Sequence, residues 1–554
     1  MCFFSVLLLL LSILILANAQ RNWRKVYLED PKRILSGYRR STDIVAEFTD
    51  LGYEYETGSI WPKPRTEMRS ESVFYTINPK TFNFSATVSN AVLKNALGRY
   101  QELTFPEKGL RPEYDLEKIE TLEVIVAEID QPLSQESNES YTLRIKAPKT
   151  TLKAKSVWGA LRGLETFSQA VYQNGSSYWV AENKITDYPR FYYRGFLIDT
   201  SRHYLPVAKI FQFLDAMAYS KFNVLHWHIV DDPSFPYVSK KFPQLHKNGA
   251  FNAKTHIYTP EDVQDIIEYA KLRGIRVMPE FDTPGHTHSW GGIPGLLTDC
   301  GETGQQEEMF NDMKGPINPI LEGSYEFLEE FFKEITEVFP DEYLHLGGDE
   351  VDFKCWMSNK RIMQWLQDKG NGGNGTTLHT HYLQKLIKII EKLKKKYIVW
   401  QEVFDDGVQI NNRTIVNVWK EGWKQEMSKV TSSGHKAILS SCWYLNYIKY
   451  GLDWPKLYKC DPEDFDGTIE QKKLVIGGSA AIWGEYVDAT NVIPRSFGRA
   501  FAVSERLWSS KDVKDVKSAL KRLWEHQCRY IQRGIPAEPV TRSRFCRKEW
   551  NSGA

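Results

Sequence analysis

The densest group of chemically capable side chains in this sequence is the run His345-Leu346-Gly347-Gly348-Asp349-Glu350. Two glycines let the backbone pass close to a bound ligand, and two adjacent carboxyl groups follow them. Because neighbouring residues of an extended strand point to opposite sides, we expect Asp349 and Glu350 to have different tasks. One could protonate a leaving group while the other orients the substrate. The alternative interpretation is a Gly-Gly-Asp turn with no catalytic task.

A second candidate is the turn-like segment 281–286, Phe-Asp-Thr-Pro-Gly-His. A single histidine is usually a structural side chain, but His286 is expected among several acids that follow neighbouring strands. In such surroundings a relay of carboxylate, histidine and carboxylate can tune the pKa of an acid catalyst.

Aromatic residues form a third candidate, since the chain of 554 residues contains 17 Trp. Such a surplus often lines sites for flat or partly apolar ligands, including sugars. Trp400, Trp419 and Trp483 follow or end expected strands, with Tyr444 nearby; packing in a core is the alternative. Acids at strand ends and aromatic walls, without a zinc or phosphate-binding motif, together indicate glycoside hydrolysis, in which carboxylic acids act.

The elements that must hold these residues are strands alternating with amphipathic helices. Apolar runs typical of buried strands occupy residues 195–198, 222–229, 275–281, 343–346, 397–400, 415–419, 437–440 and 474–483. Eight such runs over about 330 residues predict an α/β fold, a (β/α)8 barrel rather than an open sheet. Active sites of such barrels lie where the strands end. The polar residues expected there are Asp199, Asp231, Asp232, Asp282, Asp349, Glu350, Gln401, Glu402 and Glu485.

Three parts are predicted along the chain. An apolar run at 3–16 followed by Ala17-Asn18-Ala19 predicts a signal peptide over residues 1–19, with an uncleaved anchor as the alternative. Residues 20–189 are expected to form a leading segment and a smaller α+β domain. That domain should contain strands near 121–129 and 141–147 and helices near 88–97 and 157–171. Residues 190–554 are expected to form the barrel and C-terminal helices.

Composition agrees with a secreted globular enzyme. Six cysteines follow the signal peptide; an even number suggests disulfides, and six thiols allow fifteen pairings. The near balance of 71 basic and 70 acidic residues gives no electrostatic argument for a nucleic-acid partner. We expect no metal and no cofactor. The candidate glycosylation sequons are Asn83, Asn138, Asn174, Asn374 and Asn412.

Longer motifs closely resemble the β-N-acetylhexosaminidases of glycoside hydrolase family 20, most strongly the lysosomal subunits. The likeness covers about Tyr193 to Arg506 and, more loosely, the N-terminal domain. It implies retaining hydrolysis in which the substrate's own 2-acetamido oxygen attacks the anomeric carbon. The motifs are Tyr193-Arg194-Gly195, Asp-Thr-Ser-Arg-His-Tyr-Leu-Pro at 199–206, His226-Trp227-His228, Asp-Asp-Pro-Ser-Phe-Pro at 231–236, Asp-Thr-Pro-Gly-His at 282–286, His-Leu-Gly-Gly-Asp-Glu-Val at 345–351 and Trp-Gly-Glu-Tyr-Val-Asp at 483–488.

The resemblance implies a role for each matching residue. Glu350 would be the general acid and later the base, supported by a relay of Asp231 and His286. Asp349 would hold the acetamido N–H, and Tyr444 would donate to the acetamido oxygen. Residues expected to enclose the acetamide and the sugar ring are Trp400, Trp419 and Trp483, and those expected to hold sugar hydroxyls are Arg194, Asp282 and Glu485.

The resemblance also bears on disulfides, substrate and assembly. It implies the pairs Cys300–Cys355 and Cys528–Cys546, while Cys442 and Cys460, which depart from the family pattern, are predicted to pair after the seventh strand.

Asn446-Tyr447 lacks the basic residue of the subunit type that accepts charged substrates, and the loop from Cys300 to Gly315 lacks that subunit's ganglioside-associated sequence. We therefore expect a preference for neutral terminal GlcNAc or GalNAc. The expected partners are glycoproteins, glycolipids or chitooligosaccharides; a homodimer and a lysosomal or secreted location are also expected.

Two other hypotheses remain beside the active exo-hexosaminidase. One is a carbohydrate-binding glycoprotein on a catalytically dead barrel, which the intact Asp349-Glu350 pair disfavours. The other is a specialised chitooligosaccharide or N-glycan-processing enzyme of the same family. It would share the catalytic residues and differ in its loops.

Overall fold

The computed structural model describes residues 57–107, 109–110, 116–300, 314–370, 374–447, 449 and 451–546. The predicted signal peptide, the leading segment to residue 56 and most of the loop between Cys300 and Gly315 lie outside the described residues. Among the helices that are described, none combines the length and apolar character that a membrane span requires.

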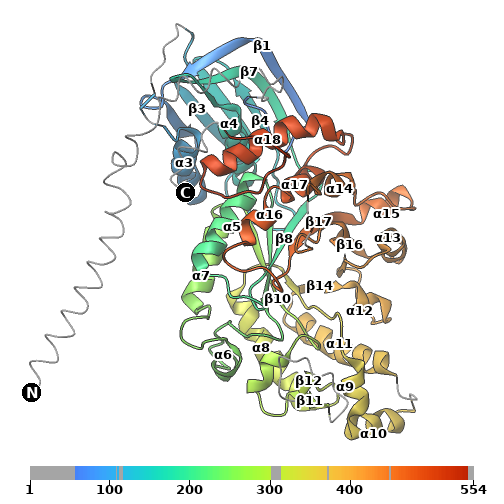
Figure 1. The fold of residues 1–554 in the computed structure, drawn as a ribbon. Helices are drawn as coiled ribbons and strands as arrows, with labels where there is room; N and C mark the ends of the chain where they lie inside the picture. Colours follow the sequence, from blue (N-terminus) through green and yellow to red (C-terminus); the bar gives the residue numbers. More distant parts are fainter. Residues whose placement is uncertain are drawn as a thin grey trace, which may run out of the picture. The chain divides into compact units, whose positions relative to one another are not determined.

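Eight parallel strands of the described chain close into a barrel (Figure 1). They follow chain order around the ring, and the last pairs with the first to close it. The first three are buried along their whole length, as expected for strands covered on both faces. The predicted (β/α)8 fold is confirmed. The strands are β8 (Tyr193–Asp199), β9 (Val224–Val230), β10 (Arg276–Phe281), β13 (Tyr343–His345), β14 (Lys396–Trp400), β15 (Ile415–Val418), β16 (Lys436–Leu439) and β17 (Val475–Ile482).

Amphipathic helices connect these strands and bury their apolar faces. In α7, Thr259 and Asp262 cap each other's backbone N–H groups and Pro260 opens the first turn. The longer helices are α5 (Val207–Tyr219), α7 (Pro260–Lys271), α8 (Glu322–Val338), α10 (Lys360–Asp368), α11 (Gly375–Lys392), α13 (Trp423–Ser432), α17 (Ala500–Trp508) and α18 (Val516–Gln532). Shorter elements are α6 (Gln244–Gly249), α9 (Phe353–Ser358), α12 (Gln401–Asp405), α14 (Trp454–Lys459), α15 (Ile469–Lys473), α16 (Val492–Ser496), η1 (His288–Gly292), η3 (Ser441–Trp443) and a hairpin of β11 (Leu297–Asp299) and β12 (Lys314–Ile317).

The N-terminal part contains a mixed sheet in the order β1-β7-β4-β5-β3-β2, with β6 paired to β7. Helix α4 (Val157–Ala170) is buried along its whole length. Asp187 ends β7 and accepts hydrogen bonds from Tyr141, Lys221 and Trp508, which ties this sheet to the barrel. The other elements are β1 (Thr66–Ile77), β2 (Asn83–Ala86), α3 (Ala91–Thr104), β3 (Thr121–Glu128), β4 (Tyr141–Ile145), β5 (Lys149–Ser156), β6 (Tyr172–Asn174) and β7 (Ser177–Asp187).

Three disulfides join the cysteines of the described chain: Cys300–Cys355, Cys442–Cys460 and Cys528–Cys546. All three predicted pairings are confirmed. The second closes the segment after β16. Of the five predicted sequons, Asn138 is half-buried and its side chain accepts from Ser140, whereas the asparagines of the other four are exposed.

Candidate active site

The two carboxyl groups of the central motif lie beyond the end of a strand. Strand β13 stops at His345, and Gly347 and Gly348 follow with φ of 69° and 94°. A Cβ atom on Gly347 would stand 1.6 Å from Oδ1 of Asp282, so the backbone there requires glycine. The prediction that strand alternation separates the two acids is therefore wrong. They differ in burial instead, since the side chain of Asp349 is 10% exposed and that of Glu350 is 58% exposed.

His286 stands between the predicted relay partners. Its Nδ1 lies 3.2 Å from Oδ1 of Asp231, and its Nε2 lies 3.7 Å from Oε2 of Glu350 and 3.8 Å from Oδ2 of Asp349. His286 and Glu350 have φ of 57° and 47°, a backbone region that side chains rarely adopt and that often marks functional sites.

The relay pair carries opposite charges. Burial disfavours a charged His286, but Asp231 and other nearby carboxylates outweigh it and raise the pKa of His286 well above its usual value. Burial likewise disfavours a charged Asp231, but His286 and Arg202 hold the pKa of Asp231 well below its usual range. An imidazolium ion thus faces Glu350.

Asp282 supports the loop that carries Asp349. Its Oδ1 accepts a hydrogen bond from Gly348 N–H at 2.9 Å, and the residue is 1% exposed. Burial and the neighbouring Asp349 raise the pKa of Asp282 well above its usual value. Because it is shielded in this way, the prediction that Asp282 holds a sugar hydroxyl is wrong.

The four predicted aromatic residues come together at the same end of the barrel, and we call them the aromatic group: Trp400, Trp419, Tyr444 and Trp483. Ring centres lie 6.3 Å apart for Trp400 and Trp419 and 5.9 Å apart for Trp419 and Tyr444. Trp419 donates its indole N–H to Glu402. Burial, followed by the charge of Asp349, raises the pKa of Tyr444 well above its usual value, so its hydroxyl remains a donor.

The prediction that Arg194 holds a sugar hydroxyl is wrong. Arg194 lies near the start of β8, at the end of the barrel opposite Asp349, because parallel strands share one direction. It is 1% exposed and both oxygens of Glu139, in the N-terminal part, accept from its Nη2 at 2.7 Å. It is a structural residue.

A second arginine, Arg202, follows β8 and lies among the residues of the site. Its Nη1 lies 2.7 Å from Oδ2 of Asp231 and 3.1 Å from Oδ2 of Asp199. Its guanidinium carbon lies 5.1 Å from the centre of the Trp483 ring. Glu485 is exposed nearby, and its charge helps to raise the pKa of Arg202. The sequence offered one indication of this difference. Arg202 follows the carboxyl end of the predicted strand, where active sites of such barrels lie, whereas Arg194 lies near the start of that strand.

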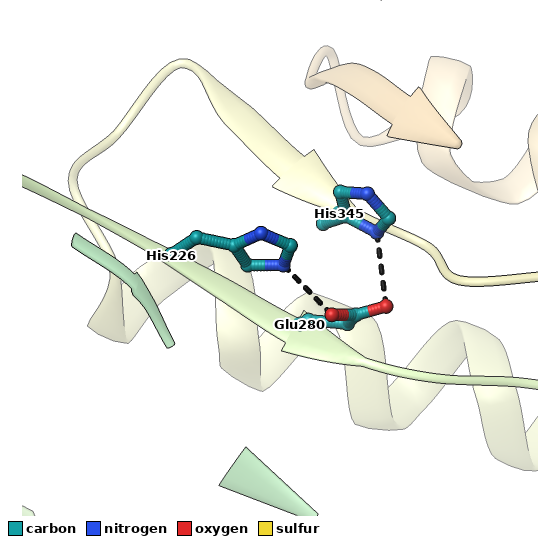
Figure 2. Close-up of side chains that lie close together, drawn as sticks. All are labelled: His226, Glu280 and His345. Atoms are coloured by element: carbon teal, nitrogen blue, oxygen red, sulfur yellow. Dashed lines mark hydrogen bonds and ion pairs between the residues drawn. The ribbon is translucent and has the colours of Figure 1, made fainter. Parts of the chain in front are cut away.

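Sequence reasoning also missed a buried carboxylate inside the barrel. Glu280, on β10, accepts from His226 Nε2 on β9 at 2.7 Å, and Nδ1 of His345 on β13 lies 3.0 Å away (Figure 2). Glu280 also accepts the indole N–H of Trp400 at 2.8 Å. A second histidine of β9, His228, lies 2.9 Å from the same carboxylate.

Groups of acids and histidines that bring at least three potential metal ligands together occur at three places in the described residues. Around Glu280 the nitrogen–oxygen separations of 2.7 to 3.0 Å are those of hydrogen bonds, so protons account for the contacts. The other two groups share His286, which the relay already explains. They are Asp231 with Asp232 and His286, and Asp282 with His286 and Asp349.

Comparison with known proteins agrees with this geometry. The glycosyl hydrolase family 20 catalytic domain matches residues 191–511, and a domain described as beta-acetyl hexosaminidase like matches residues 60–170. Beta-hexosaminidase subunit alpha of Bos taurus is 49% identical over 502 residues, covering 87% of this chain and 94% of the relative. Beta-hexosaminidase subunit beta of Homo sapiens is 50% identical over 498 residues, covering 87% of this chain and 88% of the relative.

A solved structure has the same architecture. Chitobiase from Flavobacterium johnsoniae superposes with a TM-score of 0.76 at 27% sequence identity, covering 86% of this chain and 73% of that chain. The catalytic-domain match spans more than half of the sequence, and the relatives share about half of their residues with it over most of their length. The chain therefore belongs to glycoside hydrolase family 20.

Proposed function

We propose that this protein is an exo-acting, retaining β-N-acetylhexosaminidase that removes terminal β-linked GlcNAc or GalNAc from glycoconjugates. The observation that carries the proposal is one constellation at the carboxyl ends of the strands. The charge of buried Asp349 acts on Tyr444 of the aromatic group, and the carboxyl groups of Asp349 and exposed Glu350 both lie within 3.8 Å of Nε2 of His286.

Asp349 and Tyr444 are suited to orient the substrate's acetamido group. Among the described residues no group hydrogen-bonds to the buried Oδ1 of Asp349, so this oxygen can accept the acetamido N–H. Tyr444 then donates to the acetamido oxygen while the aromatic group packs against the methyl group and the ring. The oxygen is thereby aimed at the anomeric carbon.

Glu350 is suited to transfer the proton. In the first step the acetamido oxygen bonds to the anomeric carbon, the glycosidic bond breaks, and Glu350 gives its proton to the departing oxygen. Water then opens the cyclic oxazolinium intermediate and returns a proton to Glu350. Two inversions at one carbon give retention. The exposure of Glu350 suits contact with both the leaving group and water.

Hydrolysis of a synthetic aryl N-acetyl-β-glucosaminide tests this proposal. We expect the wild type to release the β-anomer first, as seen by NMR, and Glu350→Gln to lose about 10²–10⁴-fold in kcat on substrates with poor leaving groups. A wild type that binds the sugar without hydrolysing it would instead support the dead-barrel hypothesis.

We further propose a preference for neutral substrates. Tyr447 occupies the position where the subunit type that accepts charged substrates has a basic residue. It is 60% exposed and stacks on Tyr444 with ring centres 5.9 Å apart. Two cations of the site are paired with acids, Lys420 with Glu402 at 2.8 Å and Arg202 with Asp231. Comparable rates on 6-sulfated and unsulfated glycosides would contradict this preference. A panel ending in GlcNAc, GalNAc or chitobiose separates a broad exo-enzyme from a specialised one.

The three disulfides indicate an oxidising compartment. We propose a lysosomal or secreted glycoprotein, supported by the signal peptide predicted at residues 1–19 and by the exposed sequons. We also propose a homodimer, since the relatives are named as subunits. A loss of mass when the protein secreted from cells is treated with a glycosidase tests the proposed glycosylation. Sedimentation of the treated protein tests the proposed homodimer.

A further inference from the structure

We propose that Glu280 and His228 are positioning residues for the reaction, forming the buried inner half of a hydrogen-bonded chain that runs through Asp231 to His286, whose Nε2 faces Glu350 across 3.7 Å. The proposal rests on the proposed function, because it assigns a task to the proton transfer by Glu350. It also joins two parts of the site, since Glu280 holds Trp400 of the aromatic group as well.

The chain is continuous in the structure. Oε2 of Glu280 lies 2.9 Å from Nδ1 of His228, and Nε2 of His228 lies 2.7 Å from Oδ2 of Asp231. The other oxygen of Asp231 lies 3.2 Å from Nδ1 of His286, whose Nε2 lies 3.7 Å from Glu350. Glu280, His228 and Asp231 are at most 1% exposed, so no bulk water screens them.

Charges alternate along this chain. Burial disfavours a charged His228, but Glu280 and Asp231 on either side outweigh it and raise the pKa of His228 to about 10. Burial also disfavours a charged Glu280, but the three histidines hold the pKa of Glu280 well below its usual range. The order is carboxylate, imidazolium, carboxylate, imidazolium and then Glu350.

Other groups facing the chain come from several strands. Burial, opposed by Glu280, lowers the pKa of His226 to about 4, so His226 is a neutral donor. His345 contacts Glu280 from β13, and the ring of Trp483 meets His228 edge-on with centres 4.8 Å apart. Arg202 contacts Asp231 and lies 3.5 Å from Nε2 of His228. Asp231 therefore has His228, Arg202 and His286 as cationic neighbours.

Two branches follow from this arrangement. Along the first, the charge of Glu280 keeps His228 protonated, and His228 fixes Asp231, which in turn holds the imidazolium of His286 against Glu350. Along the second, Glu280 fixes the indole of Trp400 and so one wall around the acetamide. Loss of His228 affects the first branch, and loss of Glu280 affects both.

The dependence of rate on the leaving group separates the branches. A 2,4-dinitrophenyl glycoside needs little protonation of its leaving group, whereas chitobiose needs full protonation. We expect His228→Gln to lower kcat about 30- to 100-fold on chitobiose and less than about fivefold on the dinitrophenyl glycoside, as a milder form of Glu350→Gln. Trp400→Phe should slow both substrates equally. Glu280→Gln should slow both, chitobiose more, and should shift the basic limb of the pH profile of kcat/KM.

A matched control is His379→Gln, which removes another buried histidine paired with a carboxylate, Asp406, at 2.6 Å. We expect any change there to be the same for both substrates. Equal slowing of the two substrates by His228→Gln, or no slowing, would overturn the proposal. Failure of the wild type on both substrates would instead refute the proposed function.

A measurement on the wild type keeps the proposal testable if these variants do not fold. An imidazolium between two carboxylates should give two downfield N–H proton resonances, and only one of the two protons should be lost when His228 deprotonates. Absence of such resonances at pH 8 would also overturn the proposal.

Discussion

Arg194, near the start of β8, and Arg202, just beyond its end, provide a paired test of where the active site lies. Arg194 pairs with Glu139, and Arg202 pairs with Asp231 and Asp199. We compare Arg194→Gln with Arg202→Gln, because both remove a partly or fully buried guanidinium and leave carboxylates behind. The first should cost stability alone, and the second should cost catalysis as well.

The size of each effect follows from the contacts. Arg162 still contacts Glu139 in Arg194→Gln, so we expect the low end of the usual loss for a broken buried pair, about 3 kcal/mol. With an unfolding entropy of ~2.1 cal/mol/K per residue, this lowers the Tm of the 554-residue chain by about 3 °C. If Arg202 holds a sugar hydroxyl, its loss removes a charged hydrogen bond of about 1.5–3 kcal/mol, or roughly 10- to 150-fold in kcat/KM.

The assay is kcat/KM for an aryl N-acetylglucosaminide at 25 °C, normalised to folded enzyme, with Tm from calorimetry. Arg194→Gln should keep kcat/KM within about threefold of the wild type, and Arg202→Gln should lower it at least about tenfold. The reverse pattern, with catalysis lost in Arg194→Gln and kept in Arg202→Gln, would refute the placement of the site.

Further predictions concern the loop, a buried acid and a disulfide. Gly347→Ala should abolish activity because its Cβ meets Asp282, whereas Gly407→Ala, with a similar φ of 76° and open space around the Cβ, should cost only about 1–2 kcal/mol and keep activity; equal behaviour in kinetics and denaturant melts would contradict this. Burial, with Asp453 nearby, raises the pKa of Glu538 to about 7 in the folded chain, above about 4.5 when unfolded, so its favourable contribution is complete below pH 4.5 and is lost as pH rises through 7. Glu538→Gln should therefore gain Tm relative to the wild type between pH 5 and pH 8.5, and a pH-independent difference would refute the reasoning. Replacing Cys442 and Cys460 together by Ser should cost about 3 kcal/mol, since the pair spans 18 residues, and should raise KM because Tyr444 lies within that loop; an unchanged KM would show that the bridge does not stiffen the site.

The barrel strands could be predicted because strands buried on both faces are continuous apolar runs, as in Val224–Val230. In the N-terminal sheet, β3 and β4 were expected, but β1 and β5 were not. Their outward positions carry charged and polar residues, and only the last three residues of β1 are buried, so their apolar signal is weak.

The site was predicted where chemistry and strand ends coincide, as at Asp349, Glu350 and the aromatic group. Glu280 was missed because it lies within a strand, although a charged residue inside the apolar run at 275–281 was the available signal. Its histidine partners lie on β9 and β13, the two strands that flank β10 in the barrel. Consecutive strands of a (β/α)8 barrel are neighbours, so the strand order was predictable. The apolar runs do not report the register, which decides which side chains of adjacent strands meet.

The central claim is that the substrate's acetamido oxygen is the nucleophile, oriented by Asp349 and Tyr444. It is tested by kcat/KM for aryl glycosides whose N-acetyl group carries zero, one, two or three fluorine atoms. Each fluorine withdraws electrons and weakens that oxygen as a nucleophile. The account predicts a steep, progressive fall in kcat/KM across the series; rates that do not depend on fluorination would contradict it.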